Sequence, residues 1–172
     1  DAATGQNGSF VLSDITGGQE VQNFRATFTA SLRGGGAQPA DGFSFNFGTL
    51  PEGPLANGEE GIDNGLVVAF DLWDNGPTDL APAISIKYNG ITRAAVSMAE
   101  PNGVADPGNL PVPTDPATGQ PMTLSTGNAF VPVEIVLRRG GLMDVSYKGV
   151  KVLTNIATGY VPRTGNFGLA AR

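Results

Sequence analysis

Apolar and polar side chains alternate without interruption in the stretch Phe24-Arg25-Ala26-Thr27-Phe28-Thr29-Ala30-Ser31-Leu32. Because successive side chains of a β-strand point to opposite faces, every second residue of this stretch would lie on the same face. That face would be made of Phe24, Ala26, Phe28, Ala30 and Leu32. The pattern therefore predicts an antiparallel strand with one face in the core and the other in solvent.

The same alternation recurs along the chain and predicts further strands. It is found at residues 43–47, 84–88, 131–137 and 167–171, and residues 66–73 form a more continuously apolar run that is typical of a central strand. The pairs Asn89-Gly90 and Lys148-Gly149 each separate two such runs and predict tight hairpin turns. No stretch has the period of a convincing amphipathic helix, so the sequence predicts an all-β protein.

The length and charge of the chain limit its class and its partners. A length of 172 residues suits a single domain that covers residues 1–172. The net charge is −6 and there is no basic patch, which argues against nucleic acid as a partner, because its binding depends on Lys and Arg. The longest apolar run, residues 65–70, is far shorter than the ~18 residues of a membrane span, so no membrane insertion is expected.

The sequence contains neither cysteine nor histidine. Disulfides, thiolate nucleophiles and histidine-dependent catalytic triads are therefore excluded. A metal site would have to be built from oxygen ligands, and such ligands favour calcium over zinc or copper.

Two segments, residues 50–64 and residues 100–128, are rich in Gly together with Glu or Pro and show no alternation. Long irregular segments are uncommon in compact domains, where they are either functional or disordered. We interpret both segments as surface insertions. Within the first, Glu59 and Glu60 are adjacent, and a solvated pair of carboxylates is the simplest interpretation.

Four segments resemble, in the expected order, the legume-lectin or concanavalin-like superfamily. Pro39-Ala40-Asp41-Gly42-Phe43-Ser44-Phe45 is similar to its Ala-Asp-Gly-Phe-x-Phe segment, and residues 67–75 resemble its Val-Glu-Phe-Asp-Thr-x-x-Asn strand and metal loop. Residues 131–153 resemble its paired back-sheet strands, and residues 164–171 resemble its late Val-Gly-Phe-Ser-Ala strand. The resemblance implies two antiparallel sheets packed face to face as a jelly-roll sandwich.

The resemblance also implies a carbohydrate site. In these lectins the aspartate of Ala-Asp-Gly follows a cis peptide bond and accepts hydrogen bonds from sugar hydroxyls, which assigns Asp41 to carbohydrate binding. Asn75 would join it, with Trp73 nearby, because an aromatic face beside a carboxylate and an amide suits a sugar ring. Core packing is the other interpretation of Trp73. Strand alternation places Trp73 on the same face as Asp71, which favours the sugar site.

A calcium ion is the cofactor that the resemblance implies. Its ligands would be Asp71, the Trp73 backbone carbonyl, Asn75 and Asp79, of which the last is one residue off the usual spacing. The second metal of these lectins also needs a histidine, and a glutamate where this chain has Ala69, so it is expected to be absent. The alternative is a metal-free turn, rich in Asp and Asn, that caps a strand.

The β-glucanases that share this sandwich carry a Glu-x-Asp-x-x-Glu strand, and retaining hydrolysis needs its two carboxylates about 5–5.5 Å apart. On that pattern Ala69 replaces the nucleophile, and Asp74 is shorter than the second glutamate. The chain is therefore not expected to be an enzyme.

These observations predict a non-catalytic, lectin-like module, assisted by calcium, whose partner is a glycan or polysaccharide. The alternative is a structural or adhesive module that self-associates through its sheet edges. Either module suits an exported protein, in the extracellular space or at the cell surface.

The chain is also expected to be part of a longer protein. In the resembling superfamily a strand precedes the segment matching residues 8–15, and another follows the segment matching residues 167–171. Neither has a counterpart here, since residues 1–7 resemble a loop and a strand pattern extends to Ala171. An exposed sheet edge is therefore expected.

Overall fold

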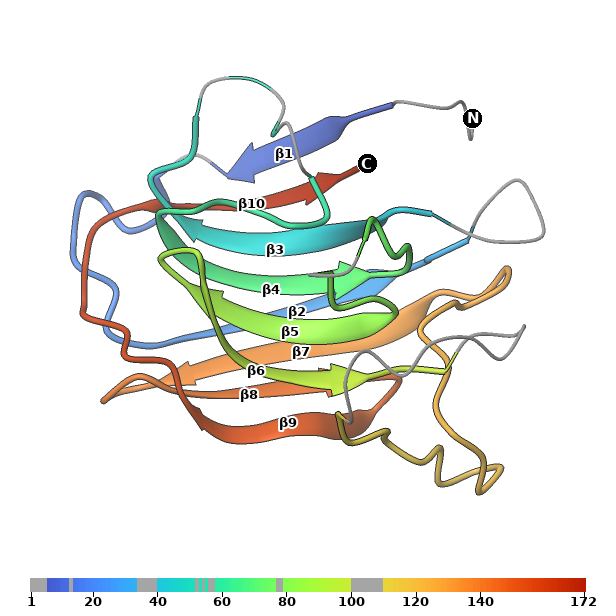
Figure 1. Cartoon of the computed structure of the whole chain (residues 1–172). Coiled ribbons are helices and arrows are strands. Elements are labelled where there is room, and N and C mark those ends of the chain that lie inside the picture. The colour runs from blue at the N-terminus through green and yellow to red at the C-terminus, as the bar shows by residue number, and fades with distance from the viewer. Residues whose placement is uncertain are drawn as a thin grey trace.

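The computed structural model describes residues 6–12, 14–33, 40–51, 53, 55, 58–76, 79–99 and 110–172. These residues form ten strands (Figure 1). The strands are β1 (Gly8–Leu12), β2 (Phe24–Ala30), β3 (Gly42–Gly48), β4 (Gly65–Asp71), β5 (Ala83–Tyr88), β6 (Ile91–Ser97), β7 (Val131–Arg138), β8 (Leu142–Tyr147), β9 (Val150–Ala157) and β10 (Asn166–Ala171).

The strands are arranged in two antiparallel sheets packed face to face, as Figure 1 shows. The large sheet has six strands in the order β1-β10-β3-β4-β5-β6, and the small sheet has four in the order β2-β7-β8-β9. No helix occurs among the described residues, and none of them forms a helix long and apolar enough to cross a membrane. The predicted all-β, two-sheet jelly-roll sandwich is confirmed.

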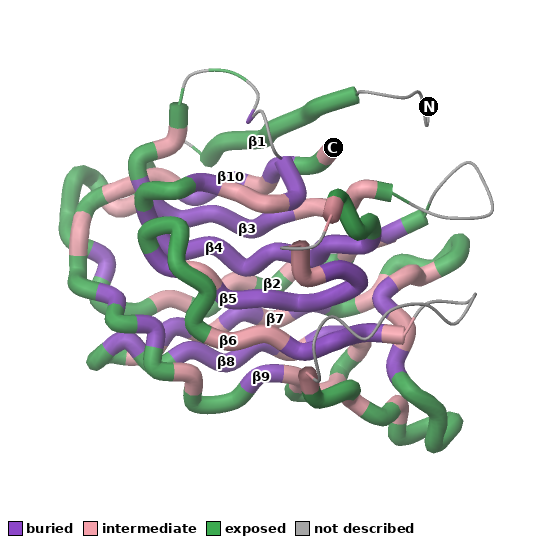
Figure 2. The backbone as a smooth tube through the Cα atoms, in the orientation of Figure 1, coloured by how far each residue is buried: buried purple, intermediate pink, exposed green. Residues whose placement is uncertain are grey.

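The core lies between the two sheets and is made of the alternate residues that the sequence pattern predicted. In β2, half-buried and exposed residues alternate along the strand from Phe24 to Ala30. Phe70 of the large sheet and Tyr147 of the small sheet are fully buried, with their ring centroids 5.8 Å apart, so aromatic packing joins the sheets. Figure 2 shows the burial concentrated in β3, β4 and β5, the middle of the large sheet.

Both predicted hairpin turns are present. Asn89 and Gly90 join β5 to β6 with φ of 51° and 73°, and Lys148 and Gly149 join β8 to β9 with φ of 52° and 78°. Two consecutive residues with positive φ form the turn type whose twist matches that of the flanking strands.

The prediction that residues 100–128 are a surface insertion is wrong for the part that lies within the described residues, 110–128. Met122 and Leu124 are almost completely buried, so apolar burial holds this segment against the sandwich. The β8–β9 turn also holds it, because the Tyr147 hydroxyl donates to the Leu124 carbonyl and the Lys148 ammonium donates to the Thr123 carbonyl at 2.7 Å. Residues 100–109 lie outside the described part of the chain.

The segments at the two ends of the described chain pair with each other. β1 runs antiparallel to β10, with Ser9 opposite Ala170 and Leu12 opposite Phe167, so the expectation that both segments lack a partner is wrong. The other side of β1 is an edge of the large sheet, as expected, and residues 1–5 lie outside the described part. That the chain belongs to a longer protein remains a prediction.

β1 and β2 are both edge strands, and an open apolar groove lies between them. Phe10 of β1 is 63% exposed, and Phe24 and Phe28 of β2 are only partly buried. The large sheet has two more strands than the small one, so part of its inner face extends beyond the sandwich. Self-association through these edges remains a prediction.

Candidate functional site

The candidate site lies on the outer face of the large sheet, where β4 ends and β3 begins. Residues of β4 alternate between the two faces, with Val68 and Phe70 in the main core and Val67 and Ala69 in a second, smaller apolar cluster. The second cluster includes Leu55 and Ile62 from the segment between β3 and β4, which crosses the outer face of the sheet (Figure 1). The described residues of this segment, 50, 51, 53, 55 and 58–64, therefore form a cover over the sheet, not the surface insertion that the sequence predicted.

Polar side chains of β3 hold this cover in position. The Ser44 hydroxyl donates to the Gly58 carbonyl, and the Ile62 amide donates to Asn46 Oδ1 at 3.0 Å. Gly61 has a φ of 78°, and a Cβ there would lie 2.6 Å from Asn46 Oδ1, so only glycine fits this close approach. The cover thus places Glu59 and Glu60 over the sheet.

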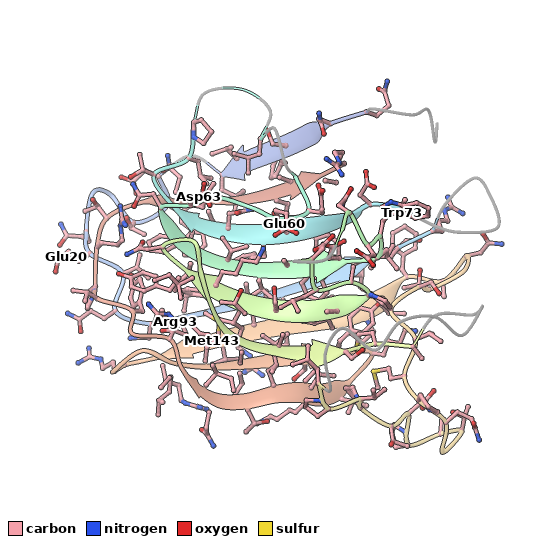
Figure 3. The ribbon with its side chains drawn as sticks, in the orientation of Figure 1. Glu20, Glu60, Asp63, Trp73, Arg93 and Met143 are labelled. Carbon is pink, nitrogen blue, oxygen red and sulfur yellow. The ribbon has the colours of Figure 1, made fainter. Side chains whose placement is uncertain are left out.

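The interpretation of Glu59 and Glu60 as a solvated pair is wrong. Glu59 is 1% exposed, and its Oε1 lies 3.0 Å from Nη2 of Arg172. Its Oε2 has no hydrogen-bond partner among the described residues. Glu60, labelled in Figure 3, forms an ion pair with Lys87 of β5. Burial lowers the pKa of Lys87, and the charge of Glu59 opposes that shift.

Three carboxylates come together at the end of β4. Oxygen atoms of Glu60, Asp71 and Asp79 all lie within 4.8 Å of one another. Burial, together with the nearby charges of Asp79 and Glu59, raises the pKa of Asp71 to about 8, against the hydrogen bond from the Trp73 amide. Gathered carboxylates of this kind need a proton or a cation to reduce their mutual repulsion.

The loop after β4 contains the turn hydrogen bonds of the metal-free alternative. The Trp73 amide donates to Asp71 Oδ1 at 3.1 Å, and the Asn75 amide donates to Asp79 Oδ2 at 2.7 Å. The side-chain amide of Asn75 donates to the Trp73 carbonyl at 3.1 Å. The structure therefore gathers two of the predicted calcium ligands, Asp71 and Asp79. The Trp73 carbonyl and Asn75 are hydrogen-bonded to each other.

Both predicted sugar-binding polar side chains contact one guanidinium group. The Ala40–Asp41 peptide bond is cis, as the resemblance implied. Nε of Arg172 donates to Asp41 Oδ2 at 2.8 Å, and Nη2 of Arg172 donates to Asn75 Oδ1 at 3.1 Å. The hydrogen bond to Asp41 and the charge of Glu59 raise the pKa of Arg172. Asp41, Asn75, Glu59 and Arg172 thus form one network.

Trp73 lies at the edge of this network and outside the core. Trp73, which is labelled in Figure 3, follows the last residue of β4 by two positions. Its relative exposure is 41%. Core packing, the other interpretation of Trp73, is therefore wrong. The exposed ring and the Asp41 carboxylate, whose side chain is 23% exposed, belong to the same end of the large sheet.

Sequence reasoning missed three residues of this arrangement: Glu59, Glu60 and Arg172. The adjacent glutamates were a signal, because a carboxylate pair inside a glycine-rich segment can be held against a sheet as well as in solvent. No local signal identifies Arg172, since its partners Asp41 and Asn75 are distant in the sequence.

No protein-family model and no curated protein matches the sequence. The chain is similar in structure to the exoplasmic/lumenal domain of VIP36 in its Ca²⁺/Man3GlcNAc-bound form, with a TM-score of 0.58 and 14% identity over 96% of this chain and 66% of that one. It is also similar to the carbohydrate recognition domain of Emp47p, with a TM-score of 0.61 and 17% identity over 96% of this chain and 68% of that one. A third similar structure is basic winged bean lectin with Tn-antigen, with a TM-score of 0.56 and 18% identity over 95% and 66%.

The chain thus spans about two thirds of the length of each of these structures. At such identities the similarity establishes the fold.

Proposed function

We propose that this chain, which has the concanavalin-like fold of the legume lectins, is a non-catalytic carbohydrate-binding module assisted by calcium. The observation that carries the proposal is that Asp41 and Asn75 contact the same guanidinium group, that of Arg172, and that the exposed Trp73 lies in the same loop as Asn75. Fold alone does not imply function, so the argument rests on these side chains. Two similar structures add support, since they are a Man3GlcNAc-bound form of VIP36 and basic winged bean lectin with Tn-antigen.

The chemistry of the site suits a sugar. A carboxylate accepts hydrogen bonds from hydroxyl groups, an amide can both donate and accept, and an aromatic face packs against the apolar face of a sugar ring. Asp41, Asn75 and Trp73 supply these three elements at one end of the large sheet. We propose a glycan or polysaccharide as the partner and export to the cell surface or extracellular space as the location.

The carboxylates fit a calcium ion. Calcium prefers hard oxygen ligands, and Glu60, Asp71 and Asp79 offer three carboxylates within 4.8 Å of one another. Calcium bound there would neutralise the buried Asp71 and order the loop that carries Trp73 and Asn75. Asn75 Oδ1 and the Trp73 carbonyl could join as ligands only by leaving their present hydrogen-bond partners. Glu60, a charged ligand that also pairs with Lys87, is the third ligand that we add to Asp71 and Asp79.

We expect Asp71→Asn and Asp79→Asn to abolish calcium binding measured by isothermal titration calorimetry. Glu60→Gln should weaken it about tenfold or more, because a charged ligand is removed. Asp74→Asn is the matched control, since the Asp74 carboxylate lies exposed in the same loop and accepts a hydrogen bond from the Gly76 amide. Unaltered calcium binding in Asp71→Asn would show that the loop is the metal-free turn.

Glycan binding is tested on a glycan array with and without EDTA. We expect calcium-dependent binding that Asp41→Asn abolishes, and that Trp73→Ala weakens about tenfold by removing an aromatic contact worth about 1–1.5 kcal/mol. Val161→Ala is the control for loss of an exposed apolar side chain. Val161 is 64% exposed and contacts Tyr88 at the opposite end of the large sheet. An absence of glycan binding on the array, together with concentration-dependent assembly, would support the structural or adhesive alternative.

A further inference from the structure

Arg172 takes an acceptor atom of each of the two polar side chains predicted to bind a sugar, Asp41 and Asn75. Its Nε donates to Asp41 Oδ2 at 2.8 Å, and its Nη2 donates to Asn75 Oδ1 at 3.1 Å. We propose that Arg172 is a resident cation of the glycan site, which competes with both glycan and calcium and must release Asp41 and Asn75 before they bind. This inference rests on the proposed function for its ligands, but the geometry of Arg172 stands independently of it.

The main chain keeps the Arg172 side chain at this position. The Asp41 amide donates to the Arg172 carbonyl at 3.1 Å, and the Arg172 amide donates to the Gly42 carbonyl at 3.4 Å. These bonds continue the pairing of β10 with β3, in which Ala171 lies opposite Phe43. The guanidinium is therefore tethered beside Asp41 at a high effective concentration, so it competes intramolecularly with any ligand in solution.

The hydrogen bonds from Arg172 to Asp41 and Asn75 are strong enough to lower the affinity for a ligand, and a ligand can replace them. Bonds between a guanidinium and a carboxylate are charge-assisted, and they are stronger than bonds between neutral groups. The Arg172 side chain remains 26% exposed, so water and ligands can reach it. A sugar hydroxyl that donates to Asp41 Oδ2 has to replace the Nε–H of Arg172, which lowers the observed affinity.

Glu59 explains why the guanidinium is retained. Its carboxylate is 1% exposed, Arg172 is its ion-pair partner at 3.0 Å, and Oε2 has no hydrogen-bond partner among the described residues. A buried carboxylate left without a cation is strongly destabilising. Arg172 can therefore release Asp41 and Asn75 at low cost only while it keeps Glu59, so we expect it to pivot about Glu59.

Calcium is coupled to this movement through Asn75. Its Oδ1 accepts a hydrogen bond from Arg172, and the same atom is a predicted calcium ligand, so the two interactions exclude each other. A divalent ion at Asp71 and Asp79 would also repel the guanidinium. Calcium should therefore favour the released state of Arg172, and by thermodynamic linkage the release of Arg172 should favour calcium.

The first test removes the guanidinium without leaving Glu59 charged. We expect the double variant Glu59→Gln/Arg172→Ala to bind calcium and glycan more tightly than the parent protein by about tenfold or more, since each charge-assisted bond removed from the competitor is worth roughly that much. Glu59→Gln alone is the matched control and should change both affinities much less. A folded double variant that has lost glycan binding would overturn the proposal, because Arg172 would then be a sugar contact.

The second test needs neither glycan nor calcium. In the single variant Arg172→Ala, methylguanidinium should bind at the vacated position and raise the melting temperature in a saturable manner. The response should disappear in Arg172→Ala/Asp41→Asn, which lacks the main acceptor. Equal shifts in the two variants would overturn the assignment of a guanidinium site. If no glycan binds any variant while methylguanidinium rescue succeeds, the proposed function fails and the resident cation stands.

Discussion

In the absence of calcium, the protein should lose stability as the pH rises from about 4 to about 8, and calcium should restore it at the upper end. Burial, followed by the charge of Asp79, raises the pKa of Asp71 from 3.8 to about 8 in the folded state. Between these values the folded protein keeps a proton that the unfolded chain has released, so raising the pH favours unfolding. The loss should approach about 1.4 kcal/mol per pH unit within this window.

The measurement is the urea midpoint at several pH values between 4.5 and 8.5, in EDTA and in millimolar calcium. Asp71→Asn should flatten the dependence and remove the effect of calcium, since the amide carries no titrating proton. Asp144 does not interfere, because its hydrogen bond with Arg138 lowers its pKa and places its titration below this window. An equal slope in Asp71→Asn would show that another group is responsible.

Replacing Gly42 by alanine should destabilise the whole protein and disrupt the site. Gly42 has a φ of 150°. A Cβ there would overlap the backbone carbonyl oxygen of Phe70 and would lie 3.1 Å from Asp71 Cα. Both are backbone atoms of the neighbouring strand, so relief would require separating Gly42 from Asp71, its partner in the β3–β4 ladder. We expect a loss of about 3 kcal/mol or more, since steric strain at special backbone positions produces such large effects.

The expected fall in melting temperature for Gly42→Ala is on the order of 10 °C, since 1 kcal/mol shifts a domain of this size by about 2–4 °C. Calcium binding should also fall, because the predicted ligand Asp71 is a member of the disrupted pair. Gly8→Ala is the matched control, since a Cβ at Gly8 in β1 would meet no atom within 4 Å. A Gly42→Ala protein as stable as Gly8→Ala would contradict the predicted clash.

The strands, and the face that each strand turns to the core, could be predicted from the sequence because both depend on local patterns. The alternation from Phe24 to Leu32 predicted β2 and the face that it turns to the core. Asn89-Gly90 predicted the β5–β6 turn, because positive φ at both positions is favoured by these residue types. The placement of Asp71 on the face opposite Phe70 likewise followed from the two-residue period of a strand.

The contents of the site depended on the tertiary structure, because the contacts join residues that are distant in sequence. Arg172 meets Asp41 across 131 positions and Asn75 across 97, and only the pairing of β3 with both β10 and β4 brings them together. Alternation specifies which face of a strand is apolar, but it specifies neither the neighbouring strand nor the register. Nor can it show that a loop covers the outer face, and that cover is what buries Glu59 and places Glu60 against Asp71.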